Sequence, residues 1–166
     1  MHGMLKSAAL ISLSIAISGC GMGMDHHNNR SNDPASFTSN GERIYFTGVG
    51  LDGRPIVTSG GNIHQSMHTR GCAGCHGADR QGGQRMYPFF WVKTPPLTPD
   101  ALFGEHDDTH GDHENYSSTT LERAIREGID PSGEALDSAM PRWAMAEQDL
   151  SDLVDYLGNL RTSPSF

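Results

Sequence analysis

Apolar residues follow three patterns along the chain: a short continuous run near the N-terminus, helically spaced positions near the C-terminus, and scattered groups in between. The helical spacing is clearest over residues 147–160, where Leu150, Leu153 and Leu157 occupy positions i, i+3 and i+7. Such spacing predicts an amphipathic helix that buries one face. The residue before it, Ala146, is a poor N-cap.

Two earlier helices are predicted from their first residues. Ser39 stands three positions before Glu42, which is the spacing of a capping box, and a short apolar group follows. Thr119 stands in the same way before Glu122, and we expect this second helix to end at Gly128.

The segments between these helices favour turns. Residues 51–65 contain paired turn residues around a few apolar positions, which predicts a turn-rich loop or a small hairpin. Residues 86–100 are aromatic and proline-rich, so we expect neither a helix nor a strand to run through them. The chain shows no internal repeat and no clear sheet.

The N-terminal apolar run spans residues 8–17 and follows Lys6. A membrane-spanning helix needs about 20 apolar residues, so this shorter run is typical of a secretory signal. Its end resembles the lipobox of bacterial lipoproteins, in which the cysteine, here Cys20, is acylated; an ordinary cleavage site is the simpler alternative. We expect a signal peptide over residues 1–19 and a flexible tether over residues 20–38. The chain would be exported and lipid-anchored at the periplasmic face of a bacterial membrane.

Charged residues give the chain a formal net charge of −8, from 12 Lys and Arg against 20 Asp and Glu. Nucleic-acid phosphates require a basic face, so this balance argues against a nucleic-acid partner. It favours a partner whose docking surface carries Lys or Arg, although acidity also promotes solubility.

Two cysteines and a histidine lie close together at Cys72, Cys75 and His76, among glycines. This C-x-x-C-H spacing admits a zinc clip, a redox dithiol or disulfide, or a haem attachment site. Zinc would need two more ligands, and a second paired motif is missing; a redox dithiol normally opens a helix beside a βαβ sheet. Covalent haem explains more, because each thiol can bond a vinyl group while His76 reaches the iron from the same face.

An iron bound by His76 needs a second axial ligand, and methionine or histidine is the usual donor. The candidates are Met67, Met86, Met140, Met145 and the histidines of residues 106–113. Met140 is favoured because it precedes a proline in a loop between two predicted helices, where a side chain can be aimed at a buried ring. The aromatic and leucine residues expected to pack on or near that ring are Phe89, Phe90, Trp91, Leu97, Leu102 and Trp143.

Together these motifs resemble those of class I c-type cytochromes, specifically small bacterial mono-haem ones, over about residues 39–160. The resemblance implies an all-α, cytochrome c-like fold of three to five short helices wrapped around one covalently bound haem c, in a domain of residues 39–163. It implies that the carbonyl of Pro95 accepts a hydrogen bond from His76 and that Met140 is the distal ligand.

The same resemblance places Gly41 and Tyr45 where the first helix crosses the last, facing Leu153 and Tyr156. The chain departs from compact family members in longer segments, among them residues 77–94. These segments change the surface around the haem edge but leave the attachment chemistry intact.

With both axial positions filled, the resemblance implies outer-sphere electron transfer between redox proteins such as an oxidase or dehydrogenase, and no enzymatic activity. The alternative is a haem protein with an open iron site for ligand binding, sensing or peroxide chemistry. Residues 106–113 are rich in His and Asp and could hold copper or zinc, although a solvated loop is the simpler interpretation.

Overall fold

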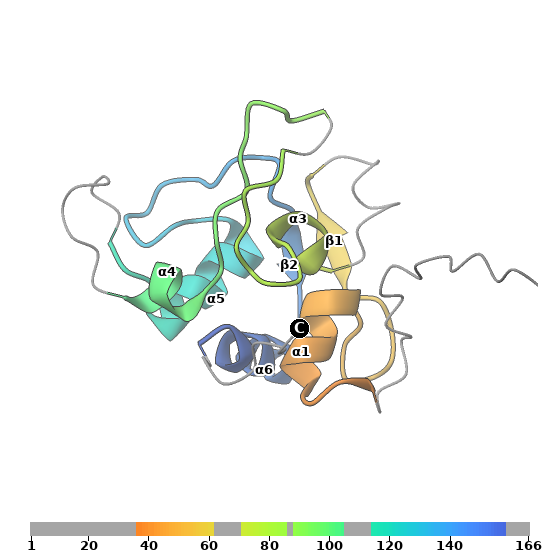
Figure 1. Cartoon of the computed structure of the whole chain (residues 1–166). Helices are drawn as coiled ribbons and strands as arrows, with labels where there is room; N and C mark the ends of the chain where they lie inside the picture. The colour runs from red at the N-terminus through yellow and green to blue at the C-terminus, as the bar shows by residue number, and fades with distance from the viewer. Residues whose placement is uncertain (1–35, 62–70, 86–87, 105–113, 159–166) are drawn as a thin grey trace, which may run out of the picture.

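The computed structural model describes residues 36–61, 71–85, 88–104 and 114–158. Within these ranges the chain forms five α-helices and one two-stranded antiparallel sheet (Figure 1). The helices are α1 (Asn40–Thr47), α3 (Ala73–His76), α4 (Pro99–Phe103), α5 (Ser118–Glu127) and α6 (Glu147–Gly158), and the strands are β1 (Val57–Ser59) and β2 (Arg142–Ala144). Because of this sheet, the predicted all-α class holds only in part. None of the described helices has the length and hydrophobicity that a membrane span requires.

Helix α1 begins where its capping-box spacing predicted. The Ser39 hydroxyl accepts a hydrogen bond from the backbone N–H of Glu42 at 3.0 Å, and the Glu42 carboxylate accepts one from the backbone N–H of Thr38 at 2.7 Å. The helix ends at Gly48, whose φ of 65° lies in the left-handed region that favours glycine.

Helix α5 begins at Ser118, next to the predicted start near Thr119, and ends at Gly128 as predicted, but the predicted capping pair of Thr119 and Glu122 is wrong. The N-cap is Ser117, whose hydroxyl accepts from the backbone N–H of Thr120 at 3.1 Å, while the Thr120 hydroxyl accepts from the backbone N–H of Ser117 at 2.8 Å. A run of serines and threonines offers several caps here, and the pair that forms both bonds sets the first turn.

Helices α1 and α6 cross in close contact (Figure 1). A Cβ on Gly41 would lie 2.0 Å from the backbone carbonyl oxygen of Asp152, so only glycine fits at the crossing. One turn further along α1, Tyr45 and Tyr156 pack with their ring centroids 5.5 Å apart. The predicted crossing at Gly41 and Tyr45 is confirmed.

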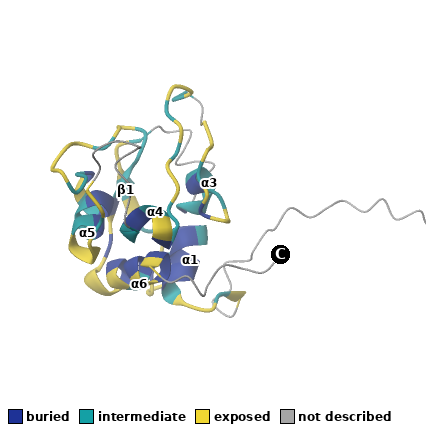
Figure 2. Ribbon diagram, turned by 60° about the vertical axis from the view of Figure 1, so that its left-hand side comes forward, coloured by how far each residue is buried: buried dark blue, intermediate teal, exposed yellow. Residues whose placement is uncertain are grey.

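Buried side chains concentrate on the facing sides of these two helices (Figure 2). The largest fully buried ones are Ile44, Tyr45, Leu150, Leu153 and Leu157. Each buried leucine or isoleucine contributes about 1.5–3 kcal/mol relative to an exposed one, so this contact holds the two ends of the domain together.

Strand β1 pairs with β2, which comes from a distant part of the chain. The sequence predicted a turn-rich loop or a small hairpin at residues 51–65, and within the described residues 51–61 a turn precedes β1 and a bend follows it. Val57 lies opposite Ala144, and Ser59 lies opposite Arg142. Each strand has three residues, which is too short to show an alternating pattern in the sequence.

The structure contains an internal repeat that the sequence analysis did not find. Arg43 and Arg123 donate to the backbone carbonyls of Gly50 and Asp130, each in the loop that follows its helix. Matching backbone bonds close the two loops: Ile56 N–H to Gly48 O at 2.8 Å, and Leu136 N–H to Gly128 O at 2.8 Å. Isolated β-bridges also match, pairing Val49 with Pro55 and Ile129 with Ala135. The shared spacing R-x4-G-x4-G-x2-[I/L] was the available sequence signal.

Candidate cofactor site

Helix α3 places the C-x-x-C-H residues on one turn. The backbone N–H groups of Cys75 and His76 both donate to the carbonyl of Cys72, at 3.1 and 2.9 Å. Residues at i, i+3 and i+4 share one face of a helix, which brings the two thiols and the imidazole together. Gly71 allows this turn to approach α1, because a Cβ there would lie 2.5 Å from the carbonyl oxygen of Tyr45.

A cavity of about 1230 Å³ lies beside this turn and is lined by Cys72, Cys75 and His76. Pro95 and Met140 reach the same cavity from distant segments. The fold thus brings together all five residues that the sequence analysis assigned to the cofactor. The volume exceeds the roughly 300–1,000 Å³ typical of small-ligand pockets, so the cavity suits a large ring system.

The imidazole of His76 is held in one orientation. Its Nδ1 lies 2.9 Å from the backbone carbonyl oxygen of Pro95, and the residue is 6% exposed. A carbonyl only accepts hydrogen bonds, so the proton resides on Nδ1, and Nε2 keeps its lone pair. Burial lowers the pKa of the imidazole, opposed by the hydrogen bond to Pro95, so the ring is the neutral form that ligates metals.

The Pro95 carbonyl is fixed by the segment that carries it. The Thr94 hydroxyl donates to the Cys75 carbonyl at 2.9 Å, and the Thr94 carbonyl accepts from the backbone N–H of Gly83 at 2.8 Å. A Cβ on Gly82 would lie 2.4 Å from the Pro95 carbonyl oxygen, so the two segments touch through backbone. This contact ties the histidine's partner to α3 itself.

Met140 is the methionine that lines the cavity within the described part of the chain. It lies between α5 and β2, and its backbone N–H donates to the Asp137 carbonyl at 3.0 Å. Met145, another candidate, is 7% exposed and belongs to the hydrophobic core.

Burial raises the pKa of the Cys72 thiol to about 12. An active redox dithiol needs a thiolate, which this burial disfavours. Among the described residues, no cluster of three or more His, Cys, Asp or Glu side chains could hold a metal ion. The thioether interpretation of the two cysteines fits this environment best.

Two residues of the cavity lining, Arg43 and Trp143, each carry a buried nitrogen without a hydrogen-bond partner among the described residues. Trp143 lines the cavity and is 6% exposed, and its indole N–H has no hydrogen-bond partner among the described residues. A buried indole N–H normally has an acceptor. Apolar walls, two thiols, an imidazole and a thioether together fit a haem, whose ring is apolar.

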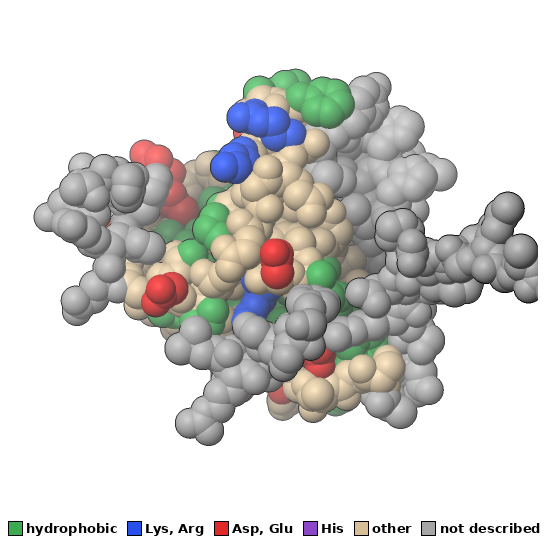
Figure 3. Space-filling model, in the orientation of Figure 1, with side chains coloured by type: hydrophobic (Ala, Val, Ile, Leu, Met, Phe, Trp, Pro, Cys, Tyr) green, Lys and Arg blue, Asp and Glu red, His purple; other side chains and the backbone are tan. Residues whose placement is uncertain are grey.

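Four of the six side chains expected near the ring line the cavity: Phe89, Leu97, Leu102 and Trp143. The other two predictions are wrong, because Phe90 is 55% exposed and Trp91 is 69% exposed. Their loop turns Phe89 inward, and the Trp91 ring packs edge-on against Phe89 at 5.5 Å. Arg85 and Lys93 of the same loop are exposed. Figure 3 shows basic side chains beside hydrophobic ones at the top of the molecule.

Several predicted features lie outside the described residues. They are the signal peptide, Cys20, the tether up to residue 35, the methionines Met67 and Met86, and the histidines of residues 106–113.

Sequence reasoning missed two arginines that support the segments around this site, the buried Arg80 and the half-buried Arg142. Arg80 is 3% exposed, and its guanidinium donates to the Tyr156 carbonyl at 3.0 Å and lies 5.1 Å from the centre of the Tyr156 ring. Arg142 binds three carbonyls beside the Met140 segment. Arg80 and Arg142 bind backbone carbonyls, so no partner side chain in the sequence marks these two arginines.

A protein-family model described as Cytochrome c matches residues 62–161 of this chain. Neither a comparison with curated proteins nor one with solved structures gave a match. The matched range contains α3, Pro95, Met140 and α6, each of which contributes to the cavity wall.

Proposed function

This chain belongs to the cytochrome c family and carries covalent haem c, and from that premise we propose that it passes single electrons between membrane-associated redox partners in the bacterial cell envelope. The observation that carries the proposal is the convergence of Cys72, Cys75, His76 and Met140 on one cavity. When bound, haem supplies a one-electron couple at its iron.

Each of the residues that hold the haem has a different role. Cys72 and Cys75 form the thioethers, and His76 presents Nε2 because Pro95 occupies its other nitrogen. The apolar walls of the cavity exclude water. Few solvent dipoles then have to reorient when an electron arrives or leaves, and this suits an electron carrier. Met140 would supply its thioether sulfur to the iron, which would leave no position for substrate.

Replacing Met140 with alanine tests the proposal directly. Oxidised wild-type protein should show the far-red absorption band of a thioether sulfur bound to haem iron, and Met140→Ala should lose it. Met145→Ala is the matched control: it removes a core methionine, so it should lower stability but keep the band. A wild type that lacks the band and binds carbon monoxide rapidly when reduced would instead support the open-iron alternative.

The membrane attachment rests on the sequence alone, because Cys20 lies outside the described residues. Acyl chains contribute about 0.8 kcal/mol per buried CH₂, so lipidated protein should remain at the periplasmic face of the membrane. Cys20→Ala should shift the haem-loaded protein from the membrane fraction to the soluble fraction. Unchanged membrane retention would contradict lipid anchoring.

The partner proposal rests on charge. The net charge of −8 supports an oxidase or dehydrogenase with a basic docking surface, whose association should slow as added salt screens the attraction. The exposed loop around Phe90 and Trp91 differs, since its described charged residues, Arg85 and Lys93, are basic. A rate that falls on Arg85→Ala but is unaffected by substituting acidic surface residues would contradict a basic partner.

A further inference from the structure

We propose that Arg142 is the positioning residue that holds the Met140 segment against the haem cavity. The inference rests on the proposed role of Met140 as an iron ligand, and it goes beyond that role by naming what keeps the ligand in place. Arg142 lies on β2, two residues after Met140, and its guanidinium donates to the Met140 carbonyl.

The guanidinium of Arg142 binds three backbone carbonyls. Its Nε donates to Glu127 O at 3.1 Å, its Nη2 donates to Leu136 O at 3.1 Å, and its Nη1 donates to Met140 O. These carbonyls belong to the last residue of α5, to the end of the repeat loop, and to the ligand residue itself. One planar group therefore contacts the beginning, the middle and the end of residues 127–140.

The fold leaves space for this group by using glycine at the end of α5. A Cβ on Gly128 would lie 1.8 Å from the Arg142 Nε, so any larger residue would displace the guanidinium. The backbone of Arg142 is also fixed, because β2 pairs with β1 and places Arg142 opposite Ser59. The guanidinium is thus anchored on a sheet and enclosed by a helix end.

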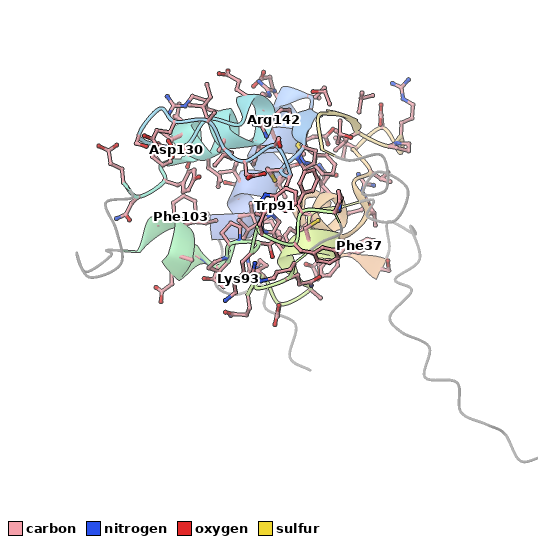
Figure 4. The ribbon with its side chains drawn as sticks, turned by 90° about the horizontal axis from the view of Figure 1, so that it is seen from above. Phe37, Trp91, Lys93, Phe103, Asp130 and Arg142 are labelled. Atoms are coloured by element: carbon pink, nitrogen blue, oxygen red, sulfur yellow. The ribbon has the colours of Figure 1, made fainter. Side chains whose placement is uncertain are left out.

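Comparison of the two copies of the internal repeat distinguishes the role of Arg142 from stabilisation of the loop that both copies share. Arg123 binds the Asp130 carbonyl just as Arg43 binds the Gly50 carbonyl in the other loop, which carries no predicted ligand. Those two bonds belong to the loop common to both copies. The bonds of Arg142 extend past that loop to Met140, and Figure 4 shows Arg142 and Asp130 along this segment.

The chemistry explains why arginine occupies this position. Methionine is unbranched and has several rotatable bonds, so a thioether reaches a fixed iron reliably only when its backbone is fixed. Arginine stays charged and offers five donors in a rigid planar fork, which can serve three carbonyls at once. Lysine has the same charge on one nitrogen and cannot span them.

The test uses the haem-loaded full chain with the substitutions Arg142→Lys and Arg142→Ala. Free imidazole competes for the sixth position, and its concentration at half-loss of the far-red band measures how firmly Met140 is held. We expect this concentration to fall about tenfold or more, since one hydrogen bond to a charged group is worth about a tenfold change in an equilibrium constant. Amide hydrogen exchange at Leu136 and Met140 should accelerate as well.

Arg126→Ala is the matched control. Arg126 also binds a backbone carbonyl, that of Met145 at 3.0 Å, and pairs with Glu147, but it does not contact the Met140 segment. Its removal should leave the imidazole concentration and the two exchange rates unchanged. Should Arg142→Ala fail to fold, Arg142→Lys decides, because it keeps the charge and most of the side chain.

The test distinguishes failure of the proposed ligand role of Met140 from failure of the proposed positioning role of Arg142. A wild type without the far-red band overturns the ligand role of Met140, and this inference with it. A wild type that has the band, loses it in Met140→Ala, and resists imidazole as strongly in both Arg142 variants as in Arg126→Ala overturns the positioning role alone.

Discussion

Nδ1 of His76 lies 2.9 Å from the backbone carbonyl oxygen of Pro95, which joins the attachment helix to a segment far along the chain. The bond sets both the tautomer and the rotation of the ring. Its geometry depends on Thr94, whose hydroxyl donates to the Cys75 carbonyl at 2.9 Å and accepts from the backbone N–H of Gln84 at 3.0 Å.

Thr94→Val removes both hydroxyl contacts and keeps the shape of the side chain. We expect a loss of about 1–3 kcal/mol in the free energy of unfolding, since partners of the hydroxyl are left unpaired. The Nδ1 proton of His76 should exchange faster with water, as measured by NMR on histidine-labelled, haem-loaded protein. Thr119→Val, on the exposed side of α5, is the control. Equal exchange rates in the two variants would refute the coupling.

Gly41→Ala should strongly weaken the crossing of α1 and α6, because the new Cβ would lie 2.0 Å from the Asp152 carbonyl oxygen. Overpacking of this kind typically costs about 1–3 kcal/mol. Gly158→Ala is the matched control on α6: its Cβ would meet only the Phe103 ring, at 3.5 Å, and should be neutral or stabilising. Urea unfolding of both variants checks the prediction, and similar midpoints would contradict it.

Tyr45→Phe tests a link between α1 and the attachment turn. The buried Tyr45 hydroxyl donates to the Gly77 carbonyl at 2.6 Å, directly after His76. Its removal should cost about 1–3 kcal/mol, because a carbonyl loses its donor inside the protein. Tyr116→Phe, at a half-buried tyrosine that lines the cavity, should change stability much less in the same calorimetric measurement.

Asp130 should make the loop before Met140 sensitive to acid. Hydrogen bonds from the Ser132 hydroxyl and from the backbone N–H of Glu134 hold the pKa of this carboxyl below its usual range. A lowered folded-state pKa gives stability that is present above the unfolded pKa and is lost as the pH falls through the folded pKa.

The difference in unfolding free energy between wild type and Asp130→Ala should therefore shrink as the pH falls below about 4. Asp52→Ala is the control for position: the pKa of Asp52 is lowered by Arg54 in the other loop. It should show the same trend in urea unfolding, whereas acid loss of the far-red band should respond to Asp130→Ala alone. A difference that stays constant with pH would contradict the linkage.

The sequence predicted the features that depend on neighbouring residues or on a strong motif. The cap at Ser39, the end of α5 at Gly128 and the C-x-x-C-H turn are of this kind. The resemblance to c-type cytochromes, stated on those motifs, is confirmed by the family match. The pairing of β1 with β2 was not predictable, because three-residue strands from distant segments carry almost no pattern.

The site was predicted less evenly. The sequence of an irregular segment does not show which side chains point into the protein. We therefore expected Phe90 and Trp91 near the ring, but both side chains are exposed. Arg142 escaped notice because its partners are carbonyls that every residue possesses. The residue types therefore indicated which groups bind the cofactor. The hydrogen bonds to backbone carbonyls that hold the surrounding segments became visible only in the structure.

The repeated helix and loop of α1 and α5 also bear on how such a site can be altered. Both copies lead toward one strand of the same sheet, but the second inserts residues 137–141 before β2, and these carry Met140. The ligand thus sits in an excursion from a duplicated scaffold whose own bonds do not depend on it. An engineer could lengthen, shorten or replace residues 137–141 to exchange the axial donor while both copies of the frame stay closed.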